Sequence, residues 1–216
     1  NGFKPQQQEI ITRILDKGGH SLGIMPTGGG KSLCFQIPAL IQKNLTVVIS
    51  PLIALMKDQI DNLVKKGTNT AFFVNSSITE RTKERIIGLV ENNKVKLLYL
   101  APESLKSDRI LDVLKKVEID LFVIDEAHCI STWGHNFRPD YLRLPEMIQE
   151  LGSPQILALT ATATKEVEDD IQKQLKIKCK VFKSSFDRPN LFIAVVSLEP
   201  KVKKESEKSA EPLKKE

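Results

Sequence analysis

The sequence MPTGGGKS at residues 25–32 joins a short apolar run, 21–25, to an apolar segment of helical spacing, 33–41. This order predicts a strand, a glycine loop and a helix. Glycines between a strand and a helix leave several backbone N–H groups pointing into one concavity, and the helix N-terminus adds the positive end of its dipole. The stretch therefore predicts a phosphate-binding loop.

Six residues of this loop are expected to face a nucleotide: Thr27, Gly28, Gly29, Gly30, Lys31 and Ser32. Lys31 would reach the terminal phosphates as a point charge, and Ser32 would offer its hydroxyl to Mg²⁺. The strict P-loop pattern has a glycine six residues before the lysine, where this chain has Met25. For the loop taken alone, the alternative interpretation is a glycine-rich turn with an exposed lysine.

Composition bounds the class of protein. The chain has 216 residues, of which 41% are hydrophobic and 27% charged, so it can bury a good core. A net charge of +5 is compatible with a nucleic-acid partner but is weak support for one. The three cysteines and three histidines match no disulfide set or metal-ligand spacing. No run of 18 apolar residues is present to span a membrane. We expect an intracellular protein with reduced thiols and no membrane partner.

Predicted strands and helices alternate after the loop. Strands are expected at 45–50, 70–74, 96–100, 120–124, 155–159 and 181–183, and helices at 52–64, 79–90, 110–117 and 166–175. This alternation favours an α/β fold with a mostly parallel central sheet and helices on both faces. In such sheets ligands bind beyond the carboxyl ends of the strands. The segments that follow the strands are therefore expected to meet at one edge.

The N-terminal segment offers a base-recognition element. Pro5 is well placed near the start of a helix that continues through an amphipathic stretch, 10–15. Gln7 carries both donors and an acceptor, so it can recognise both hydrogen-bonding positions on the edge of adenine. Phe3 or Lys4 would lie against the base. A surface helix start with polar residues is the alternative interpretation.

An apolar strand that ends in Asp125-Glu126 predicts the second half of a nucleotide-hydrolysing site. Asp125 would hold Mg²⁺ through water, and Glu126 would orient or deprotonate the attacking water. A solvated turn is the alternative. His128 is interpreted either as a buried structural histidine or as a relay from this site to Thr160 or Thr162.

The segment 129–141 holds the single tryptophan of the chain, Trp133, together with His135, Phe137 and Arg138. Aromatic faces beside a cation suit the stacking of unpaired bases. The alternative is that Trp133 and Phe137 anchor a long loop in the core. Composition alone does not separate the two.

Taken together, these segments resemble the RecQ family of ATP-dependent DNA helicases, within superfamily two. The matching segments are 3–7 for adenine, 26–32 for motif I, Ser50-Pro51-Leu52 with Gln59 for motif Ia, Ala101-Pro102-Glu103-Ser104 for a DNA-backbone motif, 125–128 for motif II, 131–138 for the aromatic-rich loop, 160–162 for motif III and 186–191 for the link to a second lobe. In this family the first glycine of the P-loop is not kept, so Met25 is no anomaly. The aromatic loop directly after Asp-Glu-Ala-His is the specific element.

The resemblance implies a RecA-like P-loop NTPase domain over residues 1–197, the first ATP-binding lobe of a helicase, with the link to lobe two starting near 186–197. A Lys/Glu-rich flexible tail is expected at 198–216. The implied cofactors are ATP and Mg²⁺, and the implied partner is DNA, single-stranded and at an unwinding junction. Implied DNA contacts or coupling residues are Ser50, Pro51, Pro102, Glu103, Trp133, His135, Phe137, Arg138, Thr160 and Thr162.

For a complete enzyme the resemblance implies 3′-to-5′ unwinding in DNA repair or recombination. The second lobe and its arginine fingers are not in this sequence, which begins at Asn1 and is expected to be an excised or truncated piece. We therefore expect a monomeric lobe with weak binding and little turnover. The alternatives are an RNA helicase lobe of the same superfamily and a non-catalytic nucleic-acid-binding module. The expected location is cytoplasmic, at the nucleoid, or nuclear, depending on the organism.

Overall fold

A parallel sheet of seven strands forms the centre of the fold in the computed structural model, which describes residues 2–133, 136–184, 192 and 194. The strands are β1 (Ser21–Ile24), β2 (Leu45–Ile49), β3 (Ala71–Val74), β4 (Leu97–Leu100), β5 (Ile119–Ile124), β6 (Gln155–Thr160) and β7 (Lys180–Lys183). Their spatial order is β3-β4-β2-β5-β6-β1-β7, and each neighbouring pair is parallel. The predicted α/β fold with a parallel sheet is therefore confirmed.

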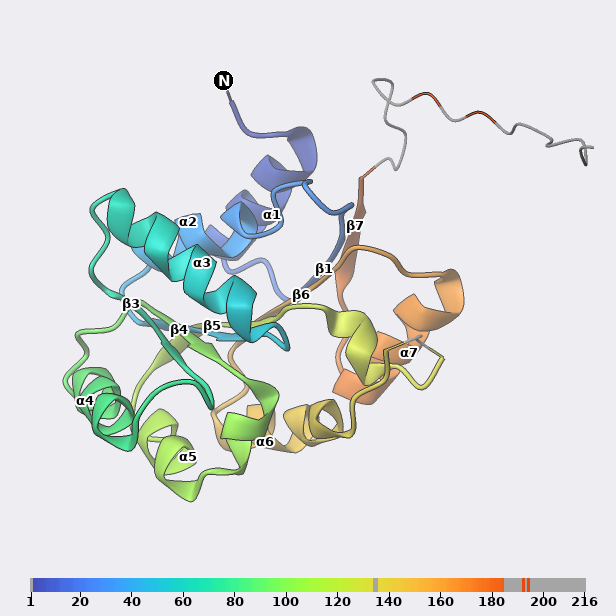
Figure 1. Cartoon of the computed structure of the whole chain (residues 1–216). Helices are drawn as coiled ribbons and strands as arrows, with labels where there is room; N and C mark the ends of the chain where they lie inside the picture. Colours follow the sequence, from blue (N-terminus) through green and yellow to red (C-terminus); the bar gives the residue numbers. More distant parts are fainter. Residues whose placement is uncertain (1, 134–135, 185–191, 193, 195–216) are drawn as a thin grey trace, which may run out of the picture. The chain divides into compact units, whose positions relative to one another are not determined.

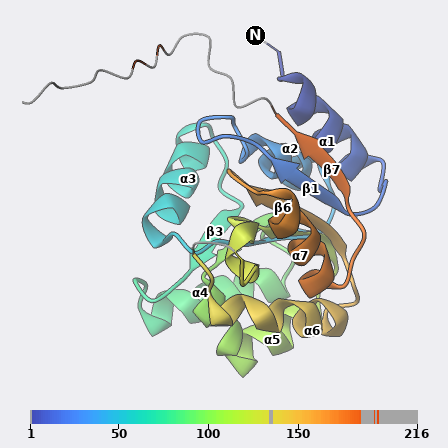
Figure 2. The same ribbon diagram turned by 90° about the vertical axis from the view of Figure 1, so that its right-hand side faces the viewer.

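Helices cover both faces of this sheet (Figures 1 and 2). They are α1 (Pro5–Leu15), α2 (Leu33–Ile41), α3 (Ile53–Lys65), α4 (Glu80–Glu91), α5 (Asp108–Leu114), α6 (Leu144–Glu150) and α7 (Lys165–Leu175), with short 3₁₀ turns η1 (Pro102–Lys106), η2 (Ala127–Ile130) and η3 (Pro139–Arg143). Helices α1, α2 and α3 pack on one face, and α4 to α7 pack on the other. Each face of the sheet is therefore closed to water.

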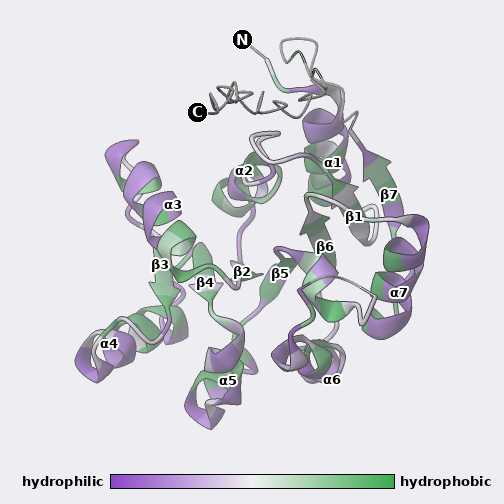
Figure 3. Cartoon of the chain, turned by 45° about the vertical axis from the view of Figure 1, so that its right-hand side comes forward, coloured by the Kyte–Doolittle hydropathy of each residue, from purple (hydrophilic) through white to green (hydrophobic). Residues whose placement is uncertain are grey.

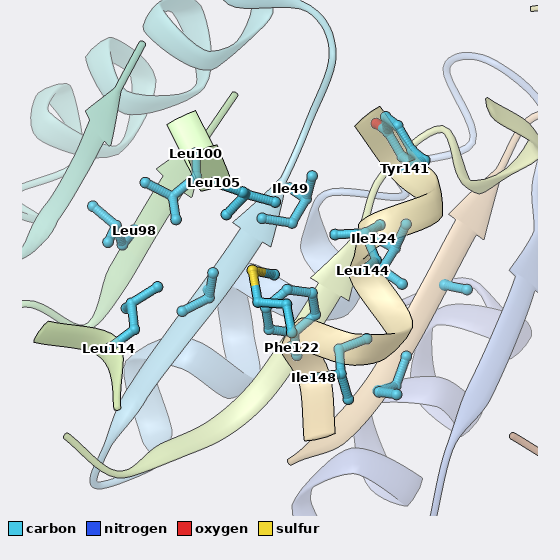
Figure 4. Packing of buried hydrophobic residues seen from close by; sticks show 14 of the residues in the cluster. Ile49, Leu98, Leu100, Leu105, Leu114, Phe122, Ile124, Tyr141, Leu144 and Ile148 are labelled. Carbon is cyan, nitrogen blue, oxygen red and sulfur yellow. The ribbon is translucent and has the colours of Figure 1, made fainter. Parts of the chain in front are cut away.

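The alternation of side chains along the strands explains the two cores. In β5, Leu121 and Val123 pack with α1 to α3, whereas Phe122 and Ile124 pack with α4 to α7. Figure 3 shows hydrophobic residues along the strands and hydrophilic residues on the outer sides of the helices. Figure 4 shows Phe122 and Ile124 against Leu144 and Ile148 of the η3–α6 segment. A strand buried on both faces is nearly all apolar, as the run at 120–124 indicated.

Most predicted elements lie close to their expected bounds. The helix expected at 79–90 is α4, and the Thr79 hydroxyl accepts the N–H of Thr82 at 3.2 Å, as a cap does. The helix expected at 110–117 lies earlier, at Asp108–Leu114. Helix α6, which is short and begins Leu-Pro-Glu, was not predicted.

All helices and strands that the structure describes lie within residues 1–186, one compact unit. Residues 187–216 form a second unit, of which only Phe192 and Ala194 are described. The predicted link at 186–191, the boundary after 197 and the Lys/Glu-rich tail lie outside the described residues and stay predictions.

The carboxyl ends of the strands bring the motif segments to one edge. The register sets Ile24 of β1 opposite Thr160 of β6, and Ile49 of β2 opposite both Leu100 of β4 and Ile124 of β5. The residues that follow these strand ends are therefore neighbours across the sheet. β6 lies between the strand before the glycine loop and the strand before Asp125-Glu126.

Candidate functional site

The glycine loop between β1 and α2 needs its glycines for backbone reasons. Gly28 and Gly30 have φ of +75° and +81°, a region that other residues rarely adopt. The Gly29 N–H donates to the Pro26 carbonyl at 2.8 Å, and a Cβ on Gly29 would lie 2.6 Å from that oxygen. The three glycines therefore permit a tight turn at the start of α2.

Lys31 and Ser32 follow at the entrance to α2, and both are partly exposed. In this structure the Lys31 ammonium donates to the Met25 carbonyl at 3.3 Å. Ser32 has helical backbone angles, and its hydroxyl caps no N–H of the helix. Thr27 is exposed. The loop thus carries one cation, Lys31, and places it with the Ser32 hydroxyl at the N-terminus of a helix.

Gln7 ties α1 to this loop. Its Nε2 lies 3.2 Å from the Gly29 carbonyl and 3.1 Å from the Gly30 carbonyl, and its Oε1 accepts the Lys4 N–H at 2.9 Å. The side chain is 4% exposed. Its carboxamide is therefore hydrogen-bonded inside the protein, while the neighbouring Phe3 and Lys4 side chains are exposed. Recognition of adenine by these residues stays a prediction.

We expect Gly30→Ala to destabilise the protein by about 1–3 kcal/mol, because alanine resists positive φ and its Cβ would overlap Gln7 Nε2. Urea unfolding measures the difference. The matched control is Gly88→Ala in the interior of α4, where a Cβ meets nothing within 4 Å. Alanine should stabilise that helix by up to about 1 kcal/mol. Equal stabilities of the two variants would contradict the packing described for the loop.

Asp125 and Glu126 directly follow β5. Asp125 accepts the Ser50 hydroxyl at 3.1 Å and the Glu126 N–H at 3.1 Å. Burial, with the nearby Glu126 charge, raises the pKa of Asp125 from 3.8 to about 6. Glu126 has φ of +50°, an uncommon backbone conformation for a residue with a side chain. Two carboxylates are thus held side by side, one of them buried, and their repulsion favours a bound cation.

Tyr141 supports the same turn from η3. It is completely buried, and its hydroxyl donates to the Asp125 carbonyl at 3.1 Å. Figure 4 shows Tyr141 beside Ile124 and Leu144. Tyr141 ends the segment 129–141, and no role at the Asp-Glu pair was predicted for it. A buried tyrosine needs a partner for its hydroxyl, but the sequence does not reveal which one.

His128 connects the Asp-Glu pair to β6. Its Nδ1 lies 2.9 Å from the Thr160 hydroxyl and 3.3 Å from Glu126 Oε2. The Thr160 hydroxyl donates to the Thr162 carbonyl at 3.1 Å, so it must accept from His128, and the proton is then on Nδ1. Burial lowers the pKa of His128 below its ordinary 6.5, which keeps the ring neutral at pH 7.

Thr160 also touches the glycine loop, because its carbonyl accepts the Met25 N–H at 3.0 Å. One residue therefore contacts the loop through its main chain and His128 through its side chain. The structure brings His128 together with Thr160, one of the two threonines named in its relay interpretation. The Thr162 carbonyl accepts from the Thr160 hydroxyl, so Thr162 is linked to His128 through Thr160. The Thr162 side chain is exposed. The relay role itself stays a prediction.

The aromatic segment forms a loop with a buried base. The Arg138 N–H donates to the Cys129 carbonyl at 2.9 Å, and Cys129, Ile130 and Tyr141 are buried. Trp133 is 75% exposed and Phe137 is 36% exposed. Trp133 is therefore not a core anchor, and the alternative that made it one is wrong for this residue. Arg138 is exposed, and His135 lies outside the described residues.

The other predicted nucleic-acid contacts lie at the same sheet edge but differ in exposure. Ser50 is 1% exposed, and its hydroxyl faces the Asp125 carboxylate rather than the surface. Pro51 is half-buried, Pro102 is buried and Glu103 is exposed. Only Glu103 of these four therefore presents an exposed side chain.

The described residues hold no group of three or more His, Cys, Asp or Glu side chains placed for a metal ion. Cys34, Cys129 and Cys179 are free thiols. Within the part of the chain that the structure describes, no helix is both long and apolar enough to cross a membrane.

Comparison with known proteins identifies the class. Residues 4–170 match the family described as DEAD/DEAH box helicase. This match covers most of the chain, which therefore belongs to the DEAD/DEAH box helicase family. Membership implies that the chain uses a nucleotide.

Two curated relatives make the likeness more specific. The ATP-dependent DNA helicase RecQ of Bacillus subtilis is 47% identical over 201 residues, which are 92% of this chain and 34% of that protein. The probable ATP-dependent DNA helicase RecS of the same organism is 44% identical over 194 residues, which are 89% of this chain and 38% of that protein. The predicted resemblance to RecQ helicases is confirmed. The chain spans little more than a third of the length of these relatives.

Solved structures agree on the fold. The helicase Lhr of Mycobacterium smegmatis, solved with single-stranded DNA and AMP-PNP, has a TM-score of 0.67 at 21% identity. The likeness covers 85% of this chain and 26% of that one. At this identity the comparison supports the fold alone, which is an α/β RecA-like helicase domain.

Proposed function

We propose that this chain is the first ATP-binding lobe of a RecQ-type DNA helicase, which couples ATP hydrolysis to 3′-to-5′ unwinding in DNA repair or recombination. The observation that carries the proposal is Thr160, which contacts the glycine loop and His128 at one sheet edge. Thr160 thereby connects the two segments that would form the halves of a phosphate-handling site. The names of the two relatives, both ATP-dependent DNA helicases, support DNA as the nucleic acid.

The residues present fit a Mg²⁺ ion. Asp125 and Glu126 are neighbouring carboxylates, and burial together with their repulsion raises the pKa of Asp125 to about 6. Carboxylate and hydroxyl oxygens are ligands that Mg²⁺ prefers, so Asp125 and Ser32 would hold it. When bound, Mg²⁺ supplies positive charge that neutralises the phosphates.

Within the site, the side chains have separate tasks. Lys31 binds the terminal phosphates of ATP once its ammonium leaves the Met25 carbonyl. Glu126 orients the attacking water and takes its proton. His128, held neutral, donates from Nδ1 to the Thr160 hydroxyl, and the same nitrogen lies 3.3 Å from Glu126 Oε2, so the ring stands between the two residues. Lys31, Asp125, Glu126 and His128 are therefore the proposed catalytic group.

Adenine binding would involve Gln7, Phe3 and Lys4 at the start of α1. The Gln7 carboxamide already contacts the backbone of Gly29 and Gly30. Binding of the base would therefore require this side chain to exchange or share those hydrogen bonds. Such an exchange would make the position of the glycine loop depend on which base is bound.

Nucleic acid would be contacted from the same sheet edge by the aromatic loop. The exposed Trp133 and Phe137 offer stacking faces, and the exposed Arg138 offers charge for the phosphates. Together with His135, Pro51, Pro102 and Glu103, they define the proposed path of a single strand. Ser50 would act through Asp125 or its main chain, because its hydroxyl faces inward.

The complete cycle of ATP hydrolysis and unwinding would need a second RecA-like lobe. This agrees with the two relatives, of whose length this chain spans 38% and 34%. We expect the isolated lobe to be monomeric and to turn over little ATP, because phosphoryl transfer also needs cations that stabilise the departing charge. Under this proposal the protein acts where the cell's DNA is, at the nucleoid or in the nucleus. A steady, DNA-stimulated ATPase rate from this chain alone would overturn the expectation of low turnover.

Binding measurements test the proposal without turnover. We expect the 216-residue chain to bind MgATP, and to bind a single-stranded DNA more tightly than an RNA of the same sequence. Fluorescence anisotropy of labelled oligonucleotides at fixed salt measures the preference. Tighter RNA binding would favour the RNA helicase lobe. Folded protein that binds DNA but no MgATP would favour the non-catalytic module.

A further inference from the structure

Ser131 lies at the start of the aromatic loop and is completely buried. Its hydroxyl donates to Asp170 Oδ2 at 2.7 Å and accepts the Trp133 N–H at 3.2 Å. A hydroxyl has one hydrogen, so the bond to Asp170 orients it and leaves a lone pair for Trp133. The main chain that carries Trp133 is therefore held by a two-step contact that begins on α7.

Asp170 is 9% exposed, and its other oxygen accepts Gln174 Nε2 at 3.2 Å. Among the described residues, no Lys, Arg or His nitrogen lies within 4 Å of its carboxylate. Its neighbour Glu168, also buried, contacts both Lys165 and Lys183. A buried carboxylate whose partners are only neutral donors is costly to bury, so its hydrogen bonds must offset that burial.

Helix α7 links the Ser131–Asp170 contact to the strand end at Thr160. The helix begins at Lys165, directly after the segment 160–164, and Thr164 caps it by accepting the Val167 N–H. The helix thus starts five residues after Thr160, which contacts the glycine loop, and carries Asp170 to the base of the aromatic loop. The contact is short and buried at both ends, so it ties the start of the aromatic loop to α7.

We infer that Asp170 is a positioning residue, which acts through Ser131 to fix the orientation of Trp133. The structural part rests on the contacts above. The part that concerns nucleic acid rests on the proposed function, in which Trp133 stacks on single-stranded DNA. Loss of the contact frees the start of the loop and spreads Trp133 over more orientations, which weakens stacking.

The single tryptophan allows a direct test, because all tryptophan fluorescence comes from Trp133. Tryptophan anisotropy and acrylamide quenching are measured on the full chain without nucleic acid, and affinity for a labelled single-stranded DNA is measured separately. The variants are Asp170→Ala, Ser131→Ala, their combination and Asp170→Asn, which keeps an acceptor for Ser131. Asp169→Ala is the matched control, since Asp169 is exposed on the same helix and pairs with Lys165.

Asp170→Ala and Ser131→Ala should each lower the tryptophan anisotropy and weaken DNA binding about tenfold. The combined variant should be no worse than either single one, because both remove the same contact. Asp170→Asn should be intermediate, and Asp169→Ala unchanged. Wild-type anisotropy in folded Asp170→Ala or Ser131→Ala protein would overturn the inference, as would an equal loss in Asp169→Ala.

The role of Trp133 in DNA contact and the positioning role of Asp170 can be refuted separately. If Trp133→Ala binds single-stranded DNA as tightly as the wild type, the proposed role of Trp133 in nucleic-acid contact is wrong. The anisotropy of the Asp170 and Ser131 variants still decides whether Asp170 positions the loop. If Asp170→Ala does not fold, Ser131→Ala and Asp170→Asn carry the test, since each alters the contact with a smaller change in charge or volume.

Discussion

Replacing Lys31 with alanine is expected to weaken MgATP binding by about a hundredfold at pH 7. Lys31 is the only basic side chain in the stretch 25–32. A hydrogen bond between ionised groups contributes about 1.5–3 kcal/mol, and its loss here leaves the phosphates facing two carboxylates. The Lys31 charge also lowers the pKa of Asp125, so the variant makes Asp125 harder to ionise as well.

Isothermal titration calorimetry of the 216-residue chain measures this change. Lys57→Ala is the control, because Lys57 is exposed on α3 and lies outside the glycine loop in the chain. Lys31→Arg should retain part of the affinity, since it keeps the charge but replaces a compact ammonium with a planar group. MgATP affinity in Lys31→Ala equal to that of the wild type would show that the glycine loop does not bind the phosphates.

The second large effect concerns stability. We expect Asp125→Asn to stabilise the protein, free of nucleotide and metal, by up to about 3 kcal/mol at pH 7. The folded chain raises the pKa of this carboxyl from 3.8 to about 6, so folding opposes its ionisation. Asparagine removes the charge and still offers an oxygen to the Glu126 N–H, while the Ser50 hydroxyl can turn to accept from the new amide.

The pH dependence of this difference has a definite sign. Below pH 3.8 the carboxyl is protonated in both states, and the variant gains nothing from this group. Between pH 3.8 and about 6 the unfolded chain releases the proton first, so the wild type loses stability as pH rises. Above about pH 6 the difference is constant.

Urea unfolding at pH 4.5 and pH 7.5 in the presence of EDTA measures this difference. Asp112→Asn, on the exposed side of α5, is the control and should show no such gain. Added Mg²⁺ should then stabilise the wild type more than Asp125→Asn, because the carboxylate is a proposed ligand. If Asp125→Asn is less stable than the wild type at pH 7.5, the interpretation is wrong that the Asp125 charge lowers stability and serves to bind Mg²⁺.

Much of the fold follows from patterns within single segments. Apolar runs such as 120–124 predicted the strands, because a strand buried on both faces is nearly all apolar. The glycines at 28–30 predicted the loop, because positive φ favours glycine. The shared sheet edge followed from strand alternation alone. The helix α6 was missed because its seven residues begin beside a proline and carry too short an apolar period to stand out.

Contacts between distant segments were beyond the sequence. The sequence did not reveal that the carboxamide of Gln7, which is predicted to face a base, bonds to the backbone of Gly29 and Gly30. Ser50 was expected at a nucleic-acid surface, and its hydroxyl faces Asp125. Ser131 and Asp170 are 39 residues apart, and nothing in either segment names the other. Such pairings depend on register and helix rotation, which short-range patterns do not determine.

Coupling between the nucleotide site and the aromatic loop is the central claim, and one measurement tests it most directly. The affinity of the wild-type chain for a labelled single-stranded DNA is measured with and without a saturating, non-hydrolysable MgATP analogue. We predict a change of about fivefold or more, which Lys31→Ala abolishes, because β6 and α7 link the two sites. Equal DNA affinities with and without the bound analogue would contradict the account.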